Sequence, residues 1–258
     1  MYQTATLANG PKKSIWCQIK SSPSLRSCRS SIKLLKTIFI NISNEVRHIN
    51  KGVRDLELWK EDTFFAEILN NVKTRTLLTS SRLYSLYQLL QNSPPEGDVA
   101  ELGVYNGGSA RLLAKTLEKY HSGKNLFLFD TFEGLPFHDD KLDMHKSGDL
   151  QSNKFEEVKE YLNDCKNAIF YKGLFADTLQ IVKNNIFSFV HIDADLYSSI
   201  TECVEFFYPR LIKGGIIIFD DYGFVSCPGA KKAVDNLFID KPEVPIYLPT
   251  GQCLVIKQ

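Results

Sequence analysis

The segment "VPIYLPTGQCLVIK" at residues 244–257 decides the fold. It contains two short apolar runs, 244–248 and 253–257, that are separated only by "PTGQ". Neighbouring parallel strands need a crossover connection of about a dozen residues or more, usually a helix. Two strands joined this tightly must therefore form an antiparallel hairpin.

The sequence upstream of the hairpin follows a different pattern. From about residue 98, short apolar runs alternate with longer segments of helical period, which is typical of a parallel sheet covered by helices. The expected parallel strands are 98–103, 125–130, 168–173, 187–193 and 215–221. The expected helices are 80–91, 108–121, 153–165, 196–208 and 228–238. The sequence thus predicts an α/β fold with a seven-stranded sheet, five strands parallel plus a C-terminal antiparallel hairpin, and helices on both faces.

The composition is that of an ordinary globular protein. Of the 258 residues, 43% are hydrophobic and 24% are charged, and the formal net charge is +1, so nothing global indicates nucleic-acid binding. No apolar run approaches the roughly 18 residues that span a bilayer, so no transmembrane segment is predicted. The cysteines form no C-x-x-C pair, which favours reduced structural thiols over disulfides and makes zinc binding the least favoured interpretation.

The start of the chain differs in composition from the rest. Glu45 is the first acidic residue, and many lysines and arginines precede it. We predict a basic N-terminal extension or cap at 1–60 and one catalytic domain at 61–258. A transit peptide, or membrane or partner binding by the amphipathic stretch 32–40, are the alternatives. No cleavage signal is legible, so a cap and a cytoplasmic location are the expectation.

Carboxylates follow two of the expected strands. "HIDADLYSS" (191–199) places Asp193 and Asp195 at the end of one buried run, and "GIIIFDDYG" (215–223) ends in Asp220 and Asp221. An unpaired buried carboxylate costs several kcal/mol and normally finds a cation or hydrogen-bond donors. One helix and one strand separate the two acidic pairs, so they should meet at neighbouring strand ends and form a cation site.

A glycine-rich turn follows the first expected strand. In "AELGVYNGGSARLLAK" (100–115), Glu101 precedes G-x-x-x-G-G-S and then a helix. Glycines let the backbone approach a ligand, and the helix start offers free N–H groups, although any strand-to-helix turn can carry glycines. Tyr105 stands where a dinucleotide-binding G-x-G-x-x-G would have its second glycine. Glu101 instead suits a ligand with positive charge.

Two further residues fit a nucleoside. Asp130 in "FDTFEGLP" (129–136) ends the second expected strand, where an acid commonly binds the two ribose hydroxyls, although it could equally cap a turn. Phe175 follows the third strand and could cover an adenine or belong to the core. The long polar segment 134–150 is interpreted as a lid over the site.

Jointly, these motifs resemble the macrocin O-methyltransferase (TylF) family of class I S-adenosylmethionine-dependent methyltransferases. The resemblance covers roughly residues 74–258 and includes "LYSLYQLL", "GLFADTL", "FYPRLIKGGIIIFDDYG" and "PGAKKAVDNLF" as well. It implies the Rossmann-like class I methyltransferase sheet, S-adenosylmethionine as methyl donor and a divalent cation, usually Mg²⁺. It also implies a hydroxyl of a sugar, in a natural product or glycan, as acceptor, and it favours a homo-oligomer.

The resemblance assigns roles residue by residue. Metal binding is implied for Asp193, Asp220 and Asp221, whereas the role of Asp195 is left open. Ala194 stands where many relatives have glycine. The expected cofactor contacts are Glu101, Gly103, Tyr105, Gly107, Ser109, Asp130, Thr131 and Phe175.

The expected catalytic residue is Asp193, with Asp193 itself or a metal-bound hydroxide as the proton acceptor. The alternatives are His191, Asp195, His138 and His145. A metal-dependent glycosyltransferase that uses "DAD" as a D-x-D motif is the competing enzyme class, but it has no use for the Glu101 loop or for Asp220 and Asp221. A non-enzymatic scaffold would show damaged cofactor residues, and none is visible.

Overall fold

The computed structural model describes residues 57–151 and 154–258. The predicted extension lies outside the described residues except for 57–60, and so does the amphipathic stretch 32–40; the boundary at residue 60 stays a prediction. Within the described ranges, no helix is both long enough and apolar enough to cross a membrane.

The sheet has the predicted architecture. Its strand order is β3-β2-β1-β4-β5-β7-β6, and β1 to β5 pair in parallel, whereas β7 runs antiparallel to both β5 and β6. The five parallel strands and the C-terminal hairpin are confirmed. The strands are β1 (Asp98–Leu102), β2 (Leu126–Asp130), β3 (Ala168–Lys172), β4 (Phe187–Ile192), β5 (Leu211–Phe219), β6 (Ile246–Tyr247) and β7 (Cys253–Ile256).

One strand begins earlier than its sequence indicated. β5 starts at Leu211 rather than at residue 215, and its register against β4 shifts between Phe187↔Leu211 and Phe189↔Ile216. The residues between the two pairings include Gly214, whose φ is +78°. A glycine with positive φ usually marks a turn, but here it lies within an irregular stretch of one continuous strand.

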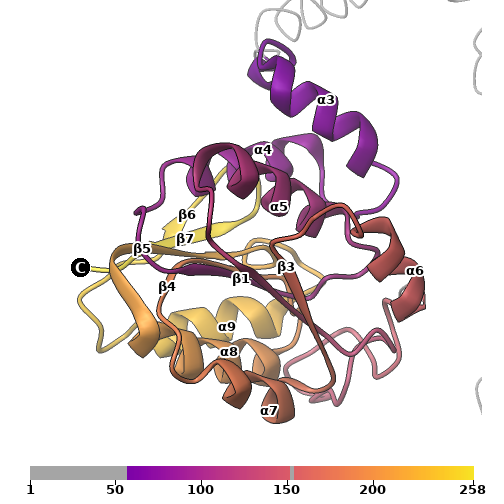
Figure 1. Ribbon diagram of the computed structural model, residues 1–258. Helices are drawn as coiled ribbons and strands as arrows, with labels where there is room; N and C mark the ends of the chain where they lie inside the picture. Colours follow the sequence, from indigo (N-terminus) through magenta and orange to yellow (C-terminus); the bar gives the residue numbers. More distant parts are fainter. Residues whose placement is uncertain (1–56, 152–153) are drawn as a thin grey trace, which may run out of the picture. The chain divides into compact units, whose positions relative to one another are not determined.

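Helices cover both faces of the sheet, as predicted (Figure 1). One face carries α4 (Ser80–Gln91) and α5 (Gly108–Tyr120), together with α3 (Thr63–Val72) and α6 (Phe155–Tyr161). The other face carries α8 (Tyr197–Phe207) and α9 (Pro228–Leu237), with the short α7 (Phe175–Thr178) beside them. The 3₁₀ turns are η2 (Leu58–Lys60), η3 (Leu179–Val182) and η4 (Tyr208–Arg210).

Helix α3 is an addition to the predicted elements. Asp62 caps its start by accepting a hydrogen bond from the backbone N–H of Phe65. Phe65, Ile68 and Val72 are buried against the domain core. Their spacing is that of one helical face, so the signal was present in the sequence but lay upstream of the clear strand–helix alternation.

The strand order indicates where on the sheet a ligand would bind. β2 and β4 flank β1, so the connections leave β1 and β4 in opposite directions, and the carboxyl ends of these two strands form a topological switch point. Ligands of open α/β sheets bind in the crevice outside such a point. The glycine loop and the acidic strand ends both follow strands that end there.

Candidate active site

A cavity of ≈ 280 Å³ opens at the carboxyl ends of the parallel strands. Its walls come from the loops that follow β1, β2, β3, β4 and β5, together with the segment before α4 and the loop 134–150. Of the predicted site residues, the cavity is lined by Gly103, Tyr105, Ser109, Asp130, Thr131, Phe175, Asp193 and Asp221. The structure thus brings residues from five strand ends to one concave site.

The glycine loop is shaped by close backbone packing. A Cβ on Gly103 would lie 1.8 Å from the carbonyl oxygen of Asp193, and the φ of Gly103 is +90°. A Cβ on Gly107, at φ +83°, would meet Val158 and Leu162 of the α6 region. Gly103 lets β1 and β4 approach at the cavity wall, whereas Gly107 serves helix packing and is not among the lining residues.

Asp130 holds the turn that follows β1. Its Oδ2 accepts hydrogen bonds from the backbone N–H groups of Val104 (2.7 Å) and Tyr105 (2.9 Å), and its Oδ1 accepts one from Phe132 (2.7 Å). A carboxylate offers about four lone-pair sites, so these donors leave capacity for a ligand hydroxyl. Both sequence interpretations, turn cap and ribose ligand, are therefore compatible with its position.

Glu101 lies beneath the cavity rather than on its wall. It is fully buried, and its Oε1 is 3.1 Å from Nδ1 of His191 on the neighbouring strand β4. Among the described residues its Oε2 has no hydrogen-bond partner. Oε1 of Glu101 is thus engaged by His191, while Oε2 is unpartnered, and the contact of Glu101 with a positively charged ligand stays a prediction.

His191 lies between the carboxylates of Glu101 and Asp220. Burial alone would lower the pKa of His191, but the carboxylates of Asp220 and Glu101 outweigh burial and raise its pKa to about 10. Its Nε2 lies 3.7 Å from Oδ1 of Asp220. The buried imidazole of His191 therefore lies between the carboxylates of Glu101 and Asp220, and its raised pKa favours the protonated form.

The predicted metal ligands converge at the ends of β4 and β5. Asp193, Asp220 and Asp221 offer carboxylate oxygens that all lie within 4.8 Å of one another. Burial, followed by the charges of Asp220 and Asp221, raises the pKa of Asp193 well above its usual range. Burial and the neighbouring Asp195 and Asp220 do the same to the pKa of Asp221. An all-carboxylate set of this kind fits a hard divalent cation such as Mg²⁺.

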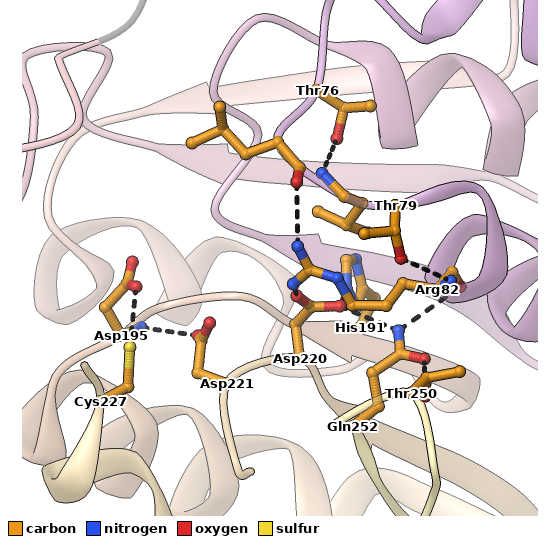
Figure 2. Close-up of polar contacts among 12 residues, drawn as sticks. Thr76, Thr79, Arg82, His191, Asp195, Asp220, Asp221, Cys227, Thr250 and Gln252 are labelled. Carbon is orange, nitrogen blue, oxygen red and sulfur yellow. Dashed lines mark hydrogen bonds and ion pairs between the residues drawn. The ribbon is translucent and has the colours of Figure 1, made fainter. Parts of the chain in front are cut away.

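Asp220 has additional partners that were not predicted. Arg82 at the start of α4 forms an ion pair with Asp220 Oδ2, and Nε2 of Gln252 donates to Asp220 Oδ1 over 2.8 Å (Figure 2). The Arg82 guanidinium also donates to the carbonyl of Leu77 (2.9 Å) and lies over the ring of Phe224. Arg82 thus neutralises part of the charge that the aspartates accumulate.

Asp195 adopts a strained backbone conformation beside this cluster. Its φ is +55°, and the N–H of Leu196 donates to the carbonyl of Ala194 over 2.5 Å, which closes a tight turn around it. The backbone N–H of Asp195 donates to Oδ2 of Asp221 over 3.0 Å (Figure 2). The turn therefore orients Asp221 and aims the Asp195 side chain into the cavity wall.

The loop 134–150 forms one wall of the cavity, as its interpretation as a lid requires. His145 lines the cavity, whereas His138 is bonded to Asp140 and to the N–H of Ser147. Oδ1 of Asp143 accepts a hydrogen bond from the N–H of Tyr197 (2.9 Å) and so fastens the loop to the start of α8. Of the two loop histidines, only His145 has the position of a proton acceptor.

The charge distribution predicts how stability depends on pH. The pKa values of Asp193 and Asp221 are raised in the folded state, so these carboxyl groups bind their protons more tightly there than in the unfolded chain. Their contribution to the free energy of unfolding therefore falls as pH rises above 3.8. The contribution of His191 to the free energy of unfolding is complete below pH 6.5 and is lost as pH rises through about 10.

We expect the free energy of unfolding in EDTA, measured by urea denaturation, to fall from pH 6.5 to about 10. The free energy of unfolding should fall less steeply with pH in Asp193→Asn than in the wild type. A wild-type free energy of unfolding that does not change over this pH range would contradict the raised pKa of His191.

Comparison with known proteins identifies a family. The profile described as macrocin O-methyltransferase (TylF) matches residues 72–242. Demethyldecarbamoylnovobiocin O-methyltransferase of Streptomyces niveus is 27% identical over 198 residues, which are 69% of this chain and 74% of that protein. The 8-demethyl-8-(2,3-dimethoxy-alpha-L-rhamnosyl)-tetracenomycin-C 4'-O-methyltransferase of Streptomyces olivaceus is 30% identical over 161 residues, 57% of this chain and 60% of that protein.

Solved structures share the fold. The O-methyltransferase NovP superposes with a TM-score of 0.62 at 24% identity, covering 71% of this chain and 82% of its own. A calicheamicin methyltransferase superposes with a TM-score of 0.61 at 18% identity, covering 97% and 99%. At these identities the superpositions establish a shared fold.

Proposed function

The chain belongs to the macrocin O-methyltransferase (TylF) family, and from that membership we propose that it methylates a sugar hydroxyl, in a glycosylated natural product or glycan, with a bound divalent cation. It is an S-adenosylmethionine-dependent O-methyltransferase. The relatives' acceptors, as their names state them, include a rhamnosyl-tetracenomycin and mycinamicin III. Family membership also replaces the glycosyltransferase interpretation of "DAD".

The observation that carries the proposal is the position of the carboxylates. Asp193 and Asp221 line the same cavity as the glycine loop and Asp130, so a cation and a methyl donor would be neighbours. Gly103 makes this possible, because its missing side chain lets the donor loop contact the backbone of Asp193. The residues fit both groups, through the free Oε2 of Glu101 and the three clustered carboxylates.

The methyl donor, the cation and the protein's own residues each supply a different part of the chemistry. S-adenosylmethionine supplies a methyl group already activated by its sulfonium. A divalent cation lowers the pKa of a hydroxyl that it binds. The protein's part is to hold oxygen, carbon and sulfur in line and to accept one proton. Asp130 and Phe175 are the proposed nucleoside contacts, and Asp193, which has two oxygens, is the proposed proton acceptor as well as a cation ligand.

A binding experiment tests the donor and the cation together. We expect S-adenosylmethionine and Mg²⁺ each to raise the melting temperature of the full-length protein, whereas UDP-sugars should not. Asp221→Asn should lose the Mg²⁺ shift and keep the S-adenosylmethionine shift. Asp240→Asn is a matched control, because Asp240 is exposed and lies outside the cavity.

Turnover then tests the reaction. Methyl transfer to a panel of glycosylated acceptors, followed by mass, should be abolished by EDTA and restored by Mg²⁺. Full activity in EDTA would remove the cation from the proposal and leave the methyltransferase assignment intact. No methylated product from any sugar-bearing acceptor would contradict the proposed acceptor class.

A further inference from the structure

A second group of metal-ligating side chains lies on the rim of the same cavity. His145 comes from the loop 134–150, Asp195 follows β4, and Cys227 precedes α9. Nε2 of His145 is 3.9 Å from Oδ1 of Asp195, and Sγ of Cys227 is 3.5 Å from the same oxygen. One ligand atom from each residue lies within 4.8 Å of the others. We propose that these residues form a binding site for a thiophilic divalent cation, for which Zn²⁺ is the best fit.

The donor atoms distinguish this site from the aspartate cluster. Nitrogen, oxygen and sulfur donors together select Zn²⁺ and similar borderline metals, whereas carboxylates alone select Mg²⁺ or Mn²⁺. Three protein ligands leave the fourth tetrahedral position of Zn²⁺ for water or a ligand atom. The absence of a C-x-x-C pair argued against zinc in the sequence, but a site with one cysteine needs no such pair.

The surroundings hold the ligands in place. Cys227 is 4% exposed, and its backbone N–H donates to the carbonyl of Phe224 over 3.0 Å. Asp195 is fixed by its bond to Asp221 and by the tight turn around it. These anchors lie in the turn that follows β4 and in the segment before α9, so backbone hydrogen bonds hold two of the three ligands.

A second carboxylate lies near the other ring nitrogen of His145. Its Nδ1 lies 3.8 Å from Oδ2 of Asp149 while its Nε2 faces Asp195. Metal-binding histidines commonly present one ring nitrogen to the ion and the other to a carboxylate, which fixes the ring and raises its basicity. The bond from Tyr197 to Asp143, two residues before His145, holds the loop at the same place.

Occupation of the site would have a consequence for the enzyme. A cation held by His145, Asp195 and Cys227 would tie the loop 134–150 to the rest of the cavity wall. It would also engage Asp195 beside the aspartate cluster. Zn²⁺ bound at this site should therefore inhibit methyl transfer even when Mg²⁺ is saturating. This consequence rests on the proposed function.

Co²⁺ is the probe that reports the sulfur ligand directly. Titrated into the reduced full-length protein with saturating Mg²⁺, Co²⁺ should produce a near-ultraviolet thiolate-to-cobalt absorption band, which Zn²⁺ should then remove. Cys227→Ser should abolish the band, and His145→Ala should weaken Co²⁺ binding at least tenfold. His138→Ala is the matched control, since His138 is in the same loop but bonded elsewhere.

The outcomes separate cleanly. A band that persists in Cys227→Ser, equal losses in His145→Ala and His138→Ala, or no band in the wild type would each overturn the site. If His145→Ala melts at a lower temperature than the wild type, His145→Gln replaces it in the Co²⁺ binding measurement. The Zn²⁺ concentration that halves each variant's own activity should rise at least tenfold in Cys227→Ser. If no acceptor is methylated, the cobalt experiment still decides the site, because it needs no turnover.

Discussion

Replacing Asp193 with asparagine should lower kcat by about 10²- to 10⁴-fold. The substitution removes the proposed proton acceptor and one of the three carboxylates that converge at the ends of β4 and β5. Steady-state methyl transfer with saturating S-adenosylmethionine and Mg²⁺ is the measurement. Retention of more than a few per cent of the wild-type kcat would remove Asp193 from its proposed role.

Stability distinguishes a lost catalytic group from a misfolded variant. Because burial and the charges of Asp220 and Asp221 raise the pKa of Asp193, the carboxylate is unfavourable in the cation-free protein. Asp193→Asn should therefore melt in EDTA at the wild-type temperature or above it. Asp240→Asn should change neither kcat nor melting temperature, since its carboxylate is exposed and outside the cavity.

Replacing Gly103 with alanine should lower the free energy of unfolding by at least about 4 kcal/mol. A Cβ at this position would stand 1.8 Å from the carbonyl oxygen of Asp193, and both belong to the backbone of paired strand ends that cannot move apart freely. The φ of +90° adds strain for any L side chain. Chemical denaturation monitored by circular dichroism measures the loss.

Gly123→Ala separates the clash from the strain. Gly123 has a similar φ of +95°, but no atom lies within 4 Å of the position that its Cβ would take. This variant should lose only the about 1–2 kcal/mol that a left-handed conformation costs. Equal losses in the two variants would show that conformation alone, rather than the contact with Asp193, requires glycine at residue 103.

The strand pattern was predictable because it depends on neighbours in the chain. Apolar runs separated by helical segments dictate parallel strands, and the short "PTGQ" connection dictates the hairpin. The start of β5 was misplaced because Gly214 and Gly215 are typical of a turn, while the sheet absorbs them as an irregular register against β4. Local signals place elements well and their ends less well.

The site was predictable where a strand end fixes the position of a side chain. Asp130, Asp193 and Asp221 reach the cavity because their strands end there. Arg82 could not be predicted, because it meets Asp220 across 138 residues of chain. The contact between Glu101 and His191 could not be predicted either, because only the pairing of β1 with β4 places the two residues side by side.

That buried pairing constrains how the protein can evolve. Glu101 and His191 face each other on neighbouring strands, fully removed from water. Removing one partner of a buried ion pair costs about 3–5 kcal/mol, whereas replacing both with apolar residues of similar volume is often neutral. A lineage that loses either residue alone passes through a severely destabilised intermediate. The two positions should therefore covary among descendants, being retained together or lost together.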